Sequence, residues 1–392
     1  MKFFGLLSML VASTACGWAQ TRLGTEFRLQ SFDMAVLESR KPRADLSCQV
    51  TPDKPGLGFD LRFHADYRVT VPIKVLADAG GWLQVLMRVT PAANRDAPTY
   101  FEQRVTVPDV PPKAKGEGLV TGGFELGYGR YQVDWMMRDA GERVCSSHWK
   151  LEAKPGRRER NLPLTLKPEM IAERGDSSSD DKLPVDRAAQ PLYVKILLNL
   201  SPARPQQSIL KREDATVLLS MLRGITREPG VDRFSLVAFN IWEQKIIARQ
   251  DKAEKIDFAG LAQAIQAPTN GTVNYRRLQD PQSNVHFVTK LLMDQLGARA
   301  ASPDAIIIVG PKVTLQKKLP LESLREGGTA PCPIFYLNYN PSPIDEPWPD
   351  TIGSALKAYS RASAYNIVFP RDLGAAMRDI LSRVAKLRSL MG

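Results

Sequence analysis

The sequence predicts an α/β plus β chain: an antiparallel β-sandwich followed by a domain with a doubly wound, mostly parallel sheet. Three observations support this prediction. Apolar and polar residues alternate over short segments in the first part, as in half-buried strands. Apolar runs then alternate with helical periodicity, as in strands joined by crossover helices. A polar segment separates the two parts. We expect a signal peptide at 1–19, a sandwich at 40–155, a linker at 156–190 and an α/β domain at 191–392.

The beginning of the chain has the pattern of a secretory signal. Lys2 precedes the apolar run Phe3–Ala12, which is too short to cross a bilayer. Small residues follow, so we expect cleavage after Ala19 and a mature chain in the periplasm or outside the cell. Cys16 raises the alternative of a lipoprotein, but Ser13 stands where a lipobox has Leu or a similar residue. No later run reaches 18 apolar residues, so we expect no transmembrane segment in the mature chain.

The predicted sandwich consists of short alternating segments separated by turn residues. Alternation is clearest at 59–63, 67–71, 83–89 and 131–137, and clusters of Gly, Pro and Asp lie between these segments. Export permits a disulfide, and Cys48 and Cys145 lie near the two ends of this domain. The segment loosely resembles immunoglobulin-like domains, which implies a bridge between two sheets. Cys332 is expected to be a buried small hydrophobe.

The second domain is predicted from six apolar runs with helical patterns between them. The expected strands are Tyr193–Leu198, Phe234–Phe239, Lys245–Ala248, Ala305–Val309, Ile334–Leu337 and Tyr365–Phe369. The expected helices lie near 210–225, from about 257, near 280–297, near 349–360 and at 373–387.

This order of elements resembles a von Willebrand factor A domain. The loop Asn270–Thr272 and the ending Tyr365–Leu373 contribute to the resemblance. More narrowly, a signal peptide, a β-rich segment and this domain resemble exported A-domain-related proteins of acidobacteria. The resemblance implies a protein-binding module and does not imply an enzyme.

The family's metal site is expected to be degenerate here. Metal-binding members hold Mg²⁺ with Asp-x-Ser-x-Ser after the first strand, a Thr on a later loop and an Asp after the fourth strand. The corresponding positions in this sequence are Asn199, Ser201, Ala203, Thr272 and Gly310. Both carboxylates are missing, and neutral oxygens alone hold a hard divalent cation poorly. We therefore expect no metal, no cofactor, and any binding at this edge to use hydrogen bonds and shape.

Charge and motifs argue against nucleic acid and against most enzyme classes. The net charge is +11, but the basic residues are scattered without interleaved aromatics, so we expect no nucleic-acid partner. Ser-x-x-Lys occurs at both Ser208–Lys211 and Ser354–Lys357 without the Lys-Thr-Gly strand of acyl-transferases. His64, His148 and His286 have no partners at catalytic or metal-ligand spacing.

We therefore expect an exported, non-enzymatic module that binds a protein or envelope partner. The alternative is an envelope-polymer hydrolase or transferase whose carboxylates cannot be placed, and the third possibility is a structural envelope component. The sequence does not indicate an oligomeric state.

Overall fold

The computed structural model describes residues 20–24, 29–111, 114–174, 191–202, 210, 212–228, 230–266, 282–297, 303–326, 330–340 and 349–391. Contacts divide the chain into two units, Met1–Leu57 with Leu61–Ser179, and Gly58–Asp60 with Asp180–Gly392. We refer to these as the N-terminal and C-terminal units, and each is described by itself. The predicted signal peptide, residues 1–19, lies outside the described residues.

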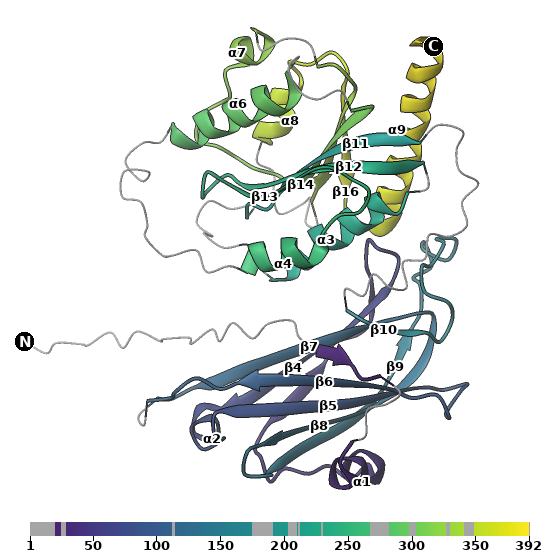
Figure 1. Cartoon of the computed structure of the whole chain (residues 1–392), viewed down its shortest axis with the longest axis vertical. Helices are drawn as coiled ribbons and strands as arrows, with labels where there is room; N and C mark the ends of the chain where they lie inside the picture. The colour runs from purple at the N-terminus through teal and green to yellow at the C-terminus, as the bar shows by residue number, and fades with distance from the viewer. Residues whose placement is uncertain are drawn as a thin grey trace, which may run out of the picture. The chain divides into compact units, whose positions relative to one another are not determined.

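Two antiparallel sheets form the N-terminal unit (Figure 1). One has the order β1-β6-β5-β8-β9, with bounds β1 Gln20–Arg22, β5 Trp82–Pro91, β6 Thr99–Thr106, β8 Gly129–Asp139 and β9 Val144–Ala153. The other has the order β10-β7-β4-β2, with β3 paired to β4. Its bounds are β2 Gln49–Pro52, β3 Gly56–Leu57, β4 Phe63–Pro72, β7 Glu117–Leu126 and β10 Ile171–Glu173. The short helix α2 (Ile73–Ala77) follows β4.

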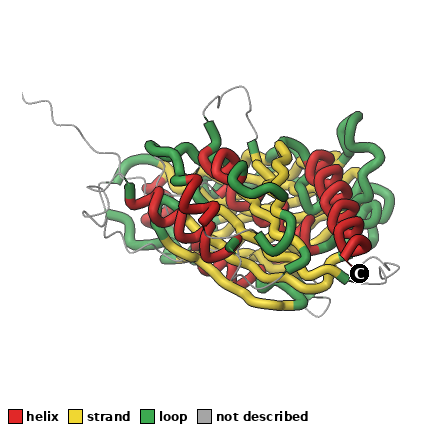
Figure 2. The backbone as a smooth tube through the Cα atoms, turned by 90° about the horizontal axis from the view of Figure 1, so that it is seen from above, coloured by secondary structure: helices red, strands yellow, loops and turns green. Residues whose placement is uncertain are grey.

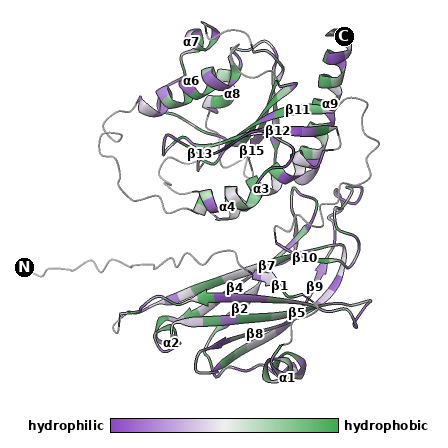
Figure 3. Cartoon of the chain, in the orientation of Figure 1, coloured by the Kyte–Doolittle hydropathy of each residue, from purple (hydrophilic) through white to green (hydrophobic). Residues whose placement is uncertain are grey.

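The alternation in the sequence explains which side chains fill the space between these sheets. Along β4 the residues are buried at every second position, and Figure 3 shows hydrophobic and hydrophilic residues alternating along the long strands. Both sheets contribute to one apolar core. At its centre Trp135 is fully buried, and the Tyr67 ring meets it edge-on with 6.0 Å between ring centroids.

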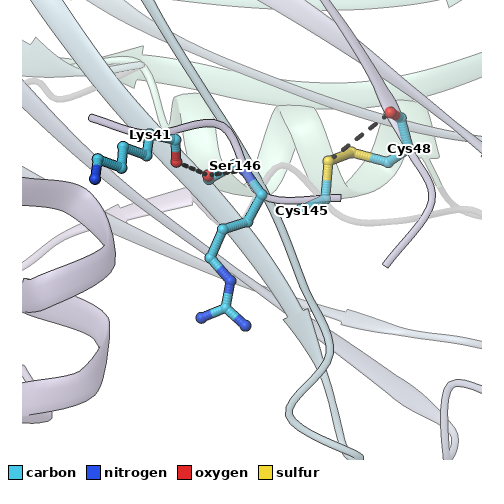
Figure 4. The surroundings of a disulfide bond; sticks show 5 residues. Lys41, Cys48, Cys145 and Ser146 are labelled. Carbon is cyan, nitrogen blue, oxygen red and sulfur yellow. Dashed lines mark hydrogen bonds between the residues drawn. A yellow bond between two sulfur atoms is a disulfide. The ribbon is translucent and has the colours of Figure 1, made fainter. Parts of the chain in front are cut away.

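The structure joins Cys48 and Cys145 in a disulfide, as predicted, with 6.1 Å between their Cα atoms (Figure 4). Cys48 directly precedes β2 of one sheet and Cys145 lies on β9 of the other, so the bond fastens the two sheets together. Beside it, the Ser146 hydroxyl donates to the Lys41 carbonyl at 3.3 Å. A hydrogen bond therefore ties the chain before β2 to β9 next to the disulfide.

Two parts of the N-terminal unit lie outside the predicted sandwich boundaries. Helix α1 (Ser31–Ser39) precedes residue 40, and its Val36 and Leu37 pack on the outer face of the β5, β8 and β9 sheet. Strand β10 lies within the predicted linker but pairs with β7. A three-residue strand carries too little periodicity to be recognised from sequence, and its pairing comes from tertiary contacts.

The C-terminal unit contains one six-stranded sheet of order β13-β12-β11-β14-β15-β16. The strands are β11 Leu192–Asn199, β12 Val231–Asn240, β13 Lys245–Ala253, β14 Ala305–Pro311, β15 Ile334–Tyr339 and β16 Ala362–Ile367. The helices are α3 Arg212–Thr226, α4 Phe258–Gln266, α6 Ser283–Leu296, α7 Leu321–Glu326, α8 Thr351–Leu356 and α9 Pro370–Met391. Figure 2 shows α9 as the long helix that ends at the C-terminus.

Apolar side chains cover both faces of this sheet. On β11, Val194, Ile196 and Leu198 belong to a core shared with α3, α4 and α9. Leu197 faces the opposite core, which is shared with α6, α7 and α8. Figure 1 shows α6, α7 and α8 on one side of the sheet and α3 and α4 on the other. The two-sided burial explains why the sequence of β11 is a continuous apolar run.

The predicted fold class requires correction. The chain is mostly β, with 39% strand and 26% helix, and is not dominated by a doubly wound parallel, von Willebrand factor A-like sheet. Among the described residues nine strand pairs are antiparallel and four are parallel. Even in the third sheet β13 runs antiparallel to β12, because the short turn Ile241–Gln244 cannot make the long crossover that a parallel pair needs.

No helix among the described residues is both long enough and apolar enough to cross a membrane.

Candidate functional site

Polar side chains gather where β11, β14 and β15 end, at the carboxyl edge of the six-stranded sheet. Gly310 of β14 lies opposite Asn338 of β15 in the parallel register. The last register pair between β11 and β14 is Leu198 with Val309, so Asn199 and Gly310 follow one step later. Asn199, Gly310 and Asn338 thus form one row, on the face that packs against α6, α7 and α8. We call this row the amide row.

Asn199 is buried and only half of its amide group is used. It is 1% exposed, and its Oδ1 accepts a hydrogen bond from the Ser201 backbone N–H at 3.0 Å. Its Nδ2 is buried without a hydrogen-bond partner in the described part of the chain. The bond to Ser201 fixes which amide atom is the oxygen, so the unpaired atom is a donor.

Ser201 has a structural task at this edge. It is fully buried, and its Oγ accepts from the Ile241 backbone N–H at 2.7 Å. Nearby Asn240, where β12 ends, accepts from the backbone N–H groups of Trp242 and Glu243 at 2.9 and 3.2 Å. These bonds hold the turn between β12 and β13. Ser201 and Asn240 therefore shape the edge, and the oxygen of each already accepts backbone hydrogen bonds there.

Gly310 lets two strands approach closely at the amide row. A Cβ at this position would lie 2.6 Å from the Asn199 Cβ and 2.8 Å from the Asn199 carbonyl oxygen, and the glycine φ is +157°. A side chain is therefore excluded between Asn199 and Asn338. The sequence comparison marked this position as one that had lost a metal-binding carboxylate. The structure shows that the close approach of β11 leaves no room for a side chain at Gly310.

Asn338 and Asn340 each bury one atom of the side-chain amide group. Neither Oδ1 has a hydrogen-bond partner among the residues that the structure describes, and Asn340 is only 3% exposed. Asn340 is held by its backbone N–H, which donates to the Ile367 carbonyl at 3.0 Å. Within the described part of the chain, the edge thus contains one unpaired buried donor, Asn199 Nδ2, and two further unpaired buried amide atoms. Each such atom costs about 1–3 kcal/mol when it stays unpaired.

Asp350 is the carboxylate found beyond β15, and it serves as a helix cap. Its side chain accepts from the Ile352 backbone N–H at 3.2 Å at the start of α8. Burial raises the pKa of the Asp350 carboxyl above its usual range, while the nearby Tyr336 hydroxyl and backbone N–H groups lower it in part. A carboxyl held this way is not aimed at an external ligand.

Only three of the five predicted metal-site positions lie among the described residues. Asn199, Ser201 and Gly310 come together at the edge, whereas Ala203 and Thr272 lie outside the described residues. Sequence reasoning missed Asn338 and Asn340, although asparagines directly following an apolar run were a usable signal. The described donor set does not suit Mg²⁺: Asn199 presents an N–H₂ group, Gly310 presents no side chain, and the Ser201 oxygen already accepts a hydrogen bond.

Three other buried polar groups among the described residues have structural surroundings that account for them. Lys195 is 6% exposed and donates to the Gln295 carbonyl at 3.2 Å, and burial lowers its pKa. Cys332 is free and buried, as expected, and burial raises its pKa to about 12, so it is a poor nucleophile. In the N-terminal unit the buried Asp134 accepts from Arg88 Nε and Nη2 at 3.0 and 2.8 Å.

Comparisons with known proteins do not assign a family. No family model matches the chain, and no curated protein matches it. One similar solved structure is a point mutant of the PilB minor pilin from Streptococcus sanguinis, with 10% identity, a TM-score of 0.28, and coverage of 80% of this chain and 90% of that one. Another is a glycosyl hydrolase family 2 member from Bacteroides cellulosilyticus, with 10% identity, a TM-score of 0.18, and coverage of 81% and 38%. A third is a β-glucuronidase from Bacteroides uniformis, with 9% identity, a TM-score of 0.18, and coverage of 75% and 36%.

TM-scores at this level support no argument about fold or activity. The chain is mostly β rather than a doubly wound α/β chain. The expected membership in that family is therefore not retained.

Proposed function

We propose that the chain is an exported, non-enzymatic protein that binds a protein partner through the amide row and Asn340. The observation that carries this proposal is the set of buried, unpaired amide atoms at one edge of the sheet. Buried polar atoms in folded proteins are almost always paired, so a group of exceptions calls for an explanation. A partner that supplies the missing hydrogen bonds recovers the free energy that the unbound protein loses.

The location of these atoms fits a binding role. They lie at the carboxyl ends of the parallel strands β11 and β15, the edge at which parallel sheets commonly place ligands. Neutral amides form hydrogen bonds but do not transfer protons near neutral pH, which favours recognition over catalysis. Asp350, the carboxyl beyond β15, is engaged as a helix cap.

Export is supported by the disulfide and by the signal-like beginning of the chain. Disulfides persist in oxidising compartments such as the periplasm and the extracellular space. The bond between Cys48 and Cys145 joins two sheets in the interior of the sandwich, as a structural disulfide does. A partner met in such a compartment is an envelope or extracellular protein.

The proposal is tested by capture and titration. The mature chain is immobilised, an envelope fraction is passed over it in EDTA, and a retained protein is purified and titrated against wild type. Asn338→Arg fills the edge with a long side chain and should weaken binding by about tenfold or more. Asn94→Arg, at an exposed position of the N-terminal unit, is the matched control. Equal affinity for both variants, or turnover of an envelope polymer that one carboxylate substitution abolishes, refutes the proposal.

A further inference from the structure

Strand β9 lies at the edge of its sheet, and only the first part of that edge is covered. In the order β1-β6-β5-β8-β9, its one neighbour is β8. The segment before β2 covers the start of β9, where the Ser146 N–H donates to the Arg43 carbonyl at 2.9 Å. After Ser146, no backbone group of β9 is bonded to a segment other than β8 in the described part of the chain. We call the stretch from His148 to Ala153 the open edge.

The pairing with β8 shows which backbone groups of the open edge face outward. The register between β8 and β9 is regular along the whole length of β9. In an antiparallel pair, every second residue turns its N–H and C=O away from the partner strand. Ser146 is such a residue, because its N–H is bonded to Arg43, and His148, Lys150 and Glu152 follow at the same spacing. Their outward backbone groups form a template for another strand.

The side chains along the open edge divide into a charged face and an apolar face. Lys150 and Glu152 are exposed, and neither forms an ion pair with another described residue. Trp149 and Leu151 point to the opposite face, where both are partly buried against the core between the two sheets. A strand that pairs here must therefore present charged side chains on one face and apolar side chains on the other.

Strand β9 of a second copy meets these requirements. In antiparallel pairing centred on Leu151, Lys150 of each copy lies opposite Glu152 of the other, which is a stabilising arrangement. Pairing centred on Lys150 or on Glu152 instead places like charges directly opposite each other, which is destabilising. The register centred on Leu151 also brings the two Leu151 side chains together, at about 5 Å between their Cβ atoms. A lone lysine on an edge discourages pairing, but here the alternation of Lys and Glu favours one register.

The length of the open edge fits the same register. Lys154 of the second copy then lies opposite His148, and Pro155 follows it. Proline has no backbone N–H and ends a ladder of hydrogen bonds. The strand of the second copy thus ends before it reaches Ser146, whose outward N–H is already bonded to Arg43.

We propose that the chain forms a symmetric dimer in which the open edges of two copies pair and join their sheets. Each contact is made twice, as a two-fold interface requires, and the pairing uses the open edge of both copies. The association therefore stops at two copies. This inference goes beyond the proposed function, because it concerns the N-terminal unit and does not involve the amide row.

The experiment measures self-association of the full mature chain by sedimentation velocity over a range of concentrations. We expect wild type to dimerise, and Lys150→Glu and Glu152→Lys each to weaken dimerisation by about tenfold or more, because each variant places like charges opposite each other twice. When the two variants are mixed, opposite charges face each other again, so a heterodimer should form with an affinity close to that of wild type. Lys74→Glu is the matched control, because it makes the same charge change at an exposed position of α2, and it should dimerise like wild type.

Mixing the variants separates strand pairing from a structural role. A variant that had lost its fold would not regain association when the other variant is added. A wild-type chain that is monomeric at every concentration, a dimer that both variants leave unchanged, or variants that weaken dimerisation but form no heterodimer would each overturn the inference. If wild type is monomeric and Lys150→Glu instead weakens a captured envelope protein, the open edge receives a strand of a different protein, and self-pairing is wrong.

Discussion

Gly310→Ala provides the most direct test of the geometry at the amide row. The added methyl would lie 2.6 Å from the Asn199 Cβ and 2.8 Å from its carbonyl oxygen, where real Cβ atoms are essentially never found. Both contacts involve atoms in or next to the backbone of β11, so β11 and β14 must separate for the methyl to fit. Overpacking of this kind costs about 1–3 kcal/mol, and the glycine φ of +157° adds strain, so we expect a loss of about 2–3 kcal/mol.

The assay is hydrogen–deuterium exchange of the full chain, followed in peptides from β11 and β14. Local opening free energies there should fall by the expected amount. Gly230→Ala is the matched control in the same unit, because its added methyl would meet only a Leu381 methyl, at 3.8 Å. That variant should exchange like wild type or slightly more slowly. A Gly310→Ala protein whose β14 peptides exchange within about 0.5 kcal/mol of wild type refutes the close approach.

Three further predictions concern buried charge and the disulfide. Asp134→Ala removes the two hydrogen bonds that Arg88 donates to this buried carboxylate and should cost about 3–5 kcal/mol by thermal unfolding, whereas Asp53→Ala, in an exposed pair, should change stability by less than about 1 kcal/mol. Cys145→Ser should lower stability by about 2–5 kcal/mol, and dithiothreitol should then have no further effect, unlike in wild type. Burial lowers the pKa of Lys195, so as the pH rises the folded state releases this proton before the unfolded state does. Stability should therefore rise with pH between the lowered pKa and 10.5. Urea unfolding at several pH values should show that Lys195→Met removes this rise.

The sandwich was predictable because its strands are buried on one face only. Period-two alternation identifies such strands without knowledge of their partners, and Cys48 and Cys145 near the ends of the segment indicated the bond that joins the sheets. Helix α1 and strand β10 were missed because each is short and is stabilised by packing on a sheet formed elsewhere in the chain.

Strand direction in the C-terminal unit was harder to predict. A two-sided apolar run specifies burial but not orientation, and only the short turn before Lys245 makes β13 antiparallel. At the edge, the search for carboxylates directed attention to Asn199 and Gly310 as losses. The unpaired amide atoms of Asn338 and Asn340 follow from the hydrogen bonding of the folded chain, which no sequence pattern records.

The disulfide also sets how this protein responds to mechanical force. Cys48 and Cys145 are separated by 97 positions in the sequence, so a chain pulled from its ends cannot extend the loop between them. At about 3.4 Å per residue, roughly 330 Å of contour length cannot be extended even after both sheets have unfolded. In single-molecule stretching, reduction should release this length as an additional extension. Under a pulling force, the chain would thus keep the segment between Cys48 and Cys145 together as one closed loop.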